Sequence, residues 1–160
     1  GPLEILQLWV NLPARLKMTD PAYTPVTRDQ IPAVQLAPGV TMHPTSGTEG
    51  APIESLTGVM LATVEIASGA SATLPAPQGR KVLFYTVRGA ARIGGKEVPE
   101  HRLARLTDGE GIEVSSEGGC LLLFGHADPI GEPVFAHGPF VMNTREEIVQ
   151  AIRDHQAGKF

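Results

Sequence analysis

Short runs of β-forming residues, separated by Gly and Pro, recur along most of the chain. From Ile31 onward they return about every eight to twelve residues, the spacing typical of a β-sandwich or β-barrel. The predicted strands cover residues 33–37, 40–43, 59–66, 72–74, 82–87, 90–93, 102–106, 112–114 and 120–124. The last of these, CLLLF, is polar on neither face, so we expect it to lie inside the fold. The pattern therefore predicts an all-β domain.

The densest part of this pattern is the stretch KVLFYTVRGAARIGGKEV, residues 81–98. It predicts a hairpin whose two strands join at Arg88 and Gly89 and whose second strand closes on a Gly-Gly turn. We expect this hairpin at the centre of a small β-barrel. A further turn is predicted at Asp108 and Gly109.

The first residues of the chain also alternate in the manner of a strand. Leu6, Leu8 and Val10 fall on one face, which predicts a half-buried strand over residues 6–10. A single helical turn is predicted over residues 14–18, before the chain becomes irregular.

The strongest helix signal comes last in the chain. Thr144 and Glu147 have the spacing of a capping box, in which each side chain bonds the other residue's backbone amide. An apolar stripe begins at Ile148, and Gly158 provides a stop. We therefore expect one C-terminal α-helix over residues 144–157.

Composition narrows the classes of function. The chain has 160 residues, 42% of them hydrophobic, which suits one folded domain. The net charge is -4 and Lys and Arg are not clustered, so we expect no direct nucleic-acid partner. No apolar run approaches the ~20 residues of a membrane span, so we expect no membrane partner. Cys120 is the single cysteine, which precludes an internal disulfide and predicts a reducing, cytoplasmic location.

The histidines are the first candidates for chemistry, but their spacing argues against a metal site. No two lie at i, i+2 or i, i+4, the spacings that point two ligands of one element the same way. We therefore expect no cofactor. If distant histidines converged, the candidate metal ligands would be His43, His101 and His126, the last close to Asp128. Cys120 has no basic neighbour in sequence, which favours a structural role.

Three segments of the chain carry a specific resemblance. They are QLWVNLP at residues 7–13, GEPV at residues 131–134 and GPFVMNTREEIVQAIRDHQAGKF at residues 138–160. Together they resemble the pirin family, in which the first segment joins two cupin domains and the last forms the terminal helix. The resemblance covers nearly the whole chain, but only the second half of a usual pirin. It implies a cupin-type jelly-roll β-barrel with one C-terminal α-helix, with residues 1–160 as a single domain.

The resemblance also implies that residues 1–20 are an interdomain strand and linker, and that residue 1 is a cut or the start of a stand-alone half-gene. Pirins include quercetin 2,3-dioxygenases and, in eukaryotes, transcriptional co-regulators. Their metal is held by three histidines and one glutamate of the N-terminal cupin, motifs that this sequence lacks. Where a metal-bearing cupin has its first histidine pair, this chain has PQGRK, residues 77–81. We expect Leu83 or Phe84 to fill the space of the metal.

One hypothesis for the function is a metal-free cupin domain that acts through binding, as the structural half of a two-cupin protein. Its expected partner is a second copy of the chain or a pirin N-terminal cupin. The candidate contact residues have apolar side chains on the first strand and the last helix: Leu6, Leu8, Trp9, Ile148 and Ile152.

Two alternatives remain. One is a quercetin 2,3-dioxygenase-like enzyme, with its metal in an N-terminal cupin outside this chain or on converging histidines. The other is a small aromatic ligand bound in a barrel pocket lined by Val82, Phe84 and Leu122.

Overall fold

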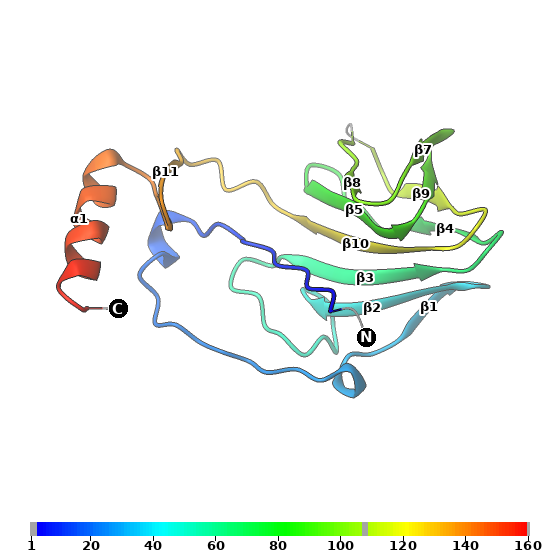
Figure 1. Cartoon of the computed structure of the whole chain (residues 1–160), viewed down its shortest axis with the longest axis horizontal. Coiled ribbons are helices and arrows are strands. Elements are labelled where there is room, and N and C mark those ends of the chain that lie inside the picture. The colour runs from blue at the N-terminus through cyan, green and yellow to red at the C-terminus, as the bar shows by residue number, and fades with distance from the viewer. Residues whose placement is uncertain (1–2, 107–108, 160) are drawn as a thin grey trace. The chain divides into compact units, whose positions relative to one another are not determined.

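The computed structural model describes residues 3–106 and 109–159, which fall into two compact units. One unit comprises residues 23–129, and the other combines the described parts of residues 1–22 and 130–160. Figure 1 traces the chain through the elements of both units. The single domain expected over residues 1–160 stays a prediction.

Two antiparallel sheets make up the unit of residues 23–129. The larger has the strand order β1-β2-β3-β10-β5-β8, and the smaller has the order β4-β9-β6-β7. The strands are β1 Val34–Ala37, β2 Val40–Ser46, β3 Met60–Ile66, β4 Ser71–Leu74, β5 Lys81–Gly89, β6 Ala91–Ile93, β7 Lys96–Val98, β8 Arg102–Leu103, β9 Ile112–Ser115 and β10 Cys120–Ala127. The predicted all-β fold is confirmed, as a β-sandwich whose described strands in this unit form two sheets and not a closed barrel.

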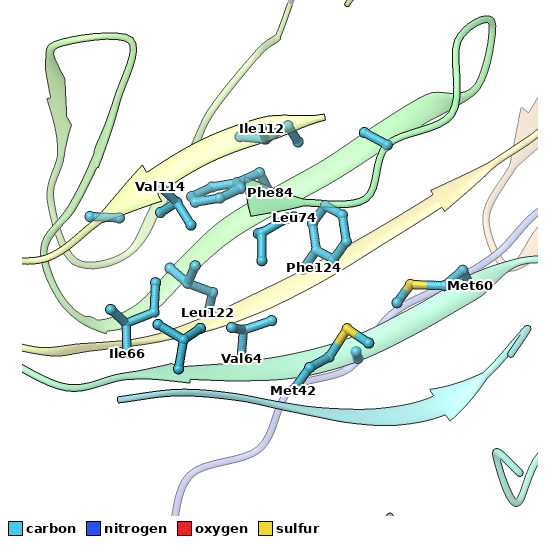
Figure 2. Packing of buried hydrophobic residues seen from close by; sticks show 14 residues of the cluster. Met42, Met60, Val64, Ile66, Leu74, Phe84, Ile112, Val114, Leu122 and Phe124 are labelled. Atoms are coloured by element: carbon cyan, nitrogen blue, oxygen red, sulfur yellow. The ribbon is translucent and has the colours of Figure 1, made fainter. Parts of the chain in front are cut away.

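The core of this unit is built from alternate residues of these strands. Along β2 and β3 nearly every second residue is buried, because successive side chains of a strand point to opposite faces. Figure 2 shows Phe84 of β5 and Leu122 and Phe124 of β10 packed among side chains of β3, β4 and β9. Removing a large apolar side chain from water contributes roughly 1.5–3 kcal/mol, so this face dominates the stability of the unit.

The predicted central hairpin is wrong in its pairing. β5 belongs to the larger sheet, whereas β6 pairs with β7 and β9 in the smaller one. Gly89, the last residue of β5, has φ +74, and a Cβ at that position would come within 2.3 Å of the Gly119 carbonyl oxygen. Only glycine fits this conformation and this close approach, so the chain turns there from one sheet into the other. The hairpin that does form is β6–β7.

Two predicted strand ends also differ from the structure. Pro44 was expected to end β2, but β2 continues to Ser46. The pairing with β1 ends at Met42, so Pro44 has a neighbouring strand on one side only, where a missing amide is tolerated. β8 is two residues long instead of five, because only Arg102 and Leu103 pair with β5. The turn expected at Asp108 and Gly109 includes a residue outside the described ones.

The strand predicted over residues 6–10 does not form. These residues are irregular and exposed, and no strand of the described residues pairs with them. An alternating apolar pattern is not sufficient for a strand, because the backbone amides and carbonyls also need hydrogen-bond partners on a neighbouring strand. The predicted helical turn is present as a short 3-10 helix, Ala14–Leu16, and a second one spans Arg28–Gln30.

The other unit contains a hairpin that the sequence patterns did not predict, β11 Phe135–His137 and β12 Phe140–Met142. The predicted helix is present as α1, Arg145–Gln156. Its capping box is confirmed: Thr144 Oγ1 accepts from the Glu147 amide at 3.2 Å, and Glu147 Oε2 accepts from the Thr144 amide at 2.8 Å. Within the described part of the chain, no helix has the length and apolar character to cross a membrane.

Replacing Leu122 by alanine tests the packed core. Leu122 is fully buried, so we expect Leu122→Ala to lower the free energy of unfolding by about 2–5 kcal/mol in urea denaturation. Leu103→Ala is the matched control in the same sheet, because Leu103 is 63% exposed, and it should change stability by about 0.5 kcal/mol or less. Equal losses in the two variants would contradict the packing described here.

Candidate functional site

The inward face of the larger sheet is lined by packed apolar side chains. Here Phe84 pairs with Phe124 across β5 and β10, and both side chains are fully buried. Leu122 lies on the same face of β10 and is also fully buried. Leu83 is only half-buried, and that either Leu83 or Phe84 fills the space of a metal stays a prediction.

The three candidate histidines do not come together. His126 is on the buried face of β10, with Leu122 and Phe124. His43 is on the opposite, outward face of the same sheet, where its Nε2 lies 3.8 Å from Glu65 Oε1. His101 sits in an exposed turn with φ 59. The described residues include no group of three or more His, Cys, Asp or Glu arranged to hold a metal ion, so the side chains described do not fit the metal that the family resemblance implies.

His126 instead forms a polar cluster with Arg80 and Asp128 at the end of β10. Arg80 Nη1 lies 3.5 Å from Asp128 Oδ2, and Arg80 Nη2 donates to the carbonyl oxygens of Gly58 and His126. The His126 ring packs edge-on against Phe124, with the ring centroids 6.0 Å apart. Two buried nitrogens of the cluster, Arg80 Nε and His126 Nδ1, have no hydrogen-bond partner.

The surroundings of His126 shift its pKa. Burial lowers its pKa below the ordinary value, and the positive charge of Arg80 lowers it further, against a smaller opposing effect of Asp128. Burial also raises the pKa of the Cys120 thiol, which keeps it protonated, in agreement with the structural role that we expect for it.

A cavity of about 460 Å³ opens in the same unit, between the β4–β5 connection and the segment after β8. Of the three predicted pocket residues, Val82 lines this cavity. Phe84 and Leu122 do not, because both are enclosed in the core. Arg80, Lys81 and Arg105 give the cavity a basic side that the patterns did not predict.

The other unit exposes an apolar segment over residues 3–10. Every described residue of this segment is exposed, and Trp9 is 69% exposed. Leu6 and Leu8 are also accessible, as their role as contact residues requires. Ile148 is not, because α1 packs it against its own hairpin, and Ile152 is half-buried. The helix thus contributes less to the predicted contact surface than its apolar stripe suggested.

Hydrogen bonds to Glu132 connect the N-terminal and C-terminal segments of this unit. Glu132 Oε2 accepts from the Ala14 amide at 2.7 Å and from Asn143 Nδ2 at 2.9 Å. A groove of about 330 Å³ lies in the same unit, between Trp9 and Met142. Sequence patterns gave no role to Glu132 or Asn143, although both lie within the segments of the family resemblance.

Comparison with known proteins identifies the family. The model of the pirin C-terminal cupin domain matches residues 61–160, well over half of the chain. The chain belongs to the pirin family. The predicted family resemblance is thereby confirmed.

Several related proteins align with nearly the whole length of this chain. It is 36% identical to a pirin-like protein of Caulobacter vibrioides over 165 residues, which cover 100% of this chain and 60% of that protein. It is 35% identical to human pirin over 170 residues, or 99% of this chain and 57% of that protein. A crystal structure of quercetin 2,3-dioxygenase from Acinetobacter baumannii superposes with a TM-score of 0.88 at 28% identity, over 95% of this chain and 55% of that one. The chain thus spans little more than half the length of these relatives.

The depressed pKa of His126 predicts an acid-sensitive stability. The unfolded chain binds the proton near the ordinary histidine pKa of about 6.5, before the folded chain does. The stability that the chain has with a neutral His126 is therefore fully present above that pH. It is lost as the pH falls toward the lower pKa of His126 in the folded chain. Urea denaturation at a series of pH values should show this loss in the wild type and a shallower one in His126→Gln.

His101→Asn is the control for this experiment. His101 is exposed, and asparagine tolerates its positive φ, so this variant should keep the wild-type pH profile. Parallel profiles for the wild type and His126→Gln would show that His126 is not perturbed by its surroundings.

Proposed function

We propose that this pirin-family chain is a metal-free cupin half that acts by binding a second cupin domain. On its own the chain self-associates through the same surface. Quercetin 2,3-dioxygenase-type chemistry, where a pirin protein has it, is assigned to the part that this chain does not span. The single cysteine, Cys120, supports a reducing, cytoplasmic setting for this role.

The observation that carries the proposal is the exposed apolar segment of residues 3–10. Leu3, Ile5 and Trp9 are each more than two-thirds exposed, and Leu6, Leu8 and Val10 are also accessible. An isolated exposed apolar residue is ordinary, but six exposed apolar residues within the eight positions of this segment are typical of an interaction site. Tryptophan is also among the residues that contribute most to protein interfaces.

The identity of the partner is supported by the lengths of the relatives. This chain covers 60% of the Caulobacter protein and 57% of human pirin, so each carries a substantial further portion. The exposed segment includes QLWVNLP, which in the family resemblance marks the junction of the two cupin domains. A cupin domain next to that junction would cover this surface.

A metal site on the converging histidines is the weaker alternative. His43 and His126 lie on opposite faces of one sheet, so their imidazoles cannot share an ion without rebuilding β2 or β10. The chemistry of a pirin-type enzyme would therefore have to come from ligands elsewhere in a longer protein.

Association of the chain tests the proposal. Size-exclusion chromatography with light scattering should give a dimer or larger species for the wild type, and a monomer for Leu6→Gln/Leu8→Gln. Trp9 is the sole tryptophan, so its emission should shift to shorter wavelength as the wild type associates, and this shift should be lost in the variant. A second arm adds the N-terminal portion of human pirin, which should form a complex with the wild type only.

Leu56→Gln/Leu103→Gln is the matched control. It changes two leucines of the other unit that are more exposed than Leu6 and Leu8, so it removes at least as much apolar surface. This control should associate as the wild type does. A wild-type chain that stays monomeric and binds no cupin partner would refute the proposal.

A further inference from the structure

The cavity in the unit of residues 23–129 is lined by both apolar and basic residues. Val82, Leu103 and Ile112 are among the apolar ones. Its volume of about 460 Å³ lies within the range of small-molecule sites, which bury an apolar body and orient it with a few polar groups.

The charges around the cavity are predominantly positive. Arg80, Lys81 and Arg105 line it, and no acidic residue does among the described lining residues. Two acidic groups of the described residues belong to the surroundings: Asp128, which is paired with Arg80, and Glu110, which lines another cavity. Asp128 can neutralise only one of the three cations, so the described lining residues retain a positive balance.

Arg80 is held in place before any ligand arrives. Its Nη atoms contact Asp128 and two backbone carbonyls, and 81% of its side chain is buried, since the exposed fraction is 19%. Its Nε is buried and lacks a hydrogen-bond partner. A buried donor without a partner is costly, so the buried position of this side chain is set by its other contacts. Lys81 and Arg105 form no ion pair with any described residue, so both cations are available to a ligand.

We propose that this cavity binds a small carboxylate with an apolar body, such as an aromatic acid. The carboxylate is bound by Arg80, Lys81 and Arg105, and the apolar body lies against Val82, Leu103 and Ile112. This site goes beyond the proposed cupin-binding role and uses residues of a different unit, so either can fail without the other.

Calorimetric titration with three probes tests the site. Benzoate should bind saturably to the wild type. Benzamide has the same ring without the charge and should bind at least about ten-fold more weakly, as expected for the loss of a charged hydrogen-bond partner. Inorganic phosphate has the charge without the apolar body and should also bind more weakly than benzoate. Added salt should weaken the benzoate complex, because exposed cations are screened.

Lys81→Gln/Arg105→Gln should weaken benzoate binding at least about ten-fold. Both residues are exposed, so the variant should fold, which circular dichroism verifies. Lys96→Gln/Arg102→Gln is the matched control, because it makes the same charge change in the same unit at residues that do not line the cavity, and it should bind like the wild type. The proposal is overturned if benzoate does not bind, if benzamide or phosphate binds as tightly, or if both double variants lose affinity equally.

Discussion

The ladder between β5 and β10 is the constraint on which the rest of the cupin unit depends. It places Phe84 opposite Phe124 on the inward face, next to Leu122, and all three side chains are excluded from water. Because protein interiors are close-packed, these three side chains fix how β5 and β10 pack against the rest of the core. The same ladder carries His126 to the edge of the core, where it meets Arg80.

Each of the two units has its own kind of candidate binding surface. In the unit of residues 23–129, the polar groups that remain near the core gather around the basic cavity and the Arg80 cluster. In the other unit, a short hairpin and a capped helix pack against each other. The segment of residues 3–10 stays exposed. A binding role is therefore supported more directly than chemistry by the residues that the structure describes.

Period-two patterns predicted most strands, because burial on one face of a sheet is a local signal. They could not predict which strands pair. β5 and β6 are consecutive in sequence but lie in different sheets, and residues 6–10 alternate without any strand beside them. The roles of Arg80 and Glu132 were missed for the same reason, since each depends on partners that are distant in sequence, Asp128 and Ala14.

We propose that packed side chains occupy the place where a metal-bearing cupin holds its ion. Elemental analysis of tag-free protein tests this proposal most directly, after incubation with iron, copper and nickel salts and removal of unbound metal. We expect far less than one metal ion per chain for each. A transition metal retained at one ion per chain, and lost on His126→Gln, would contradict it.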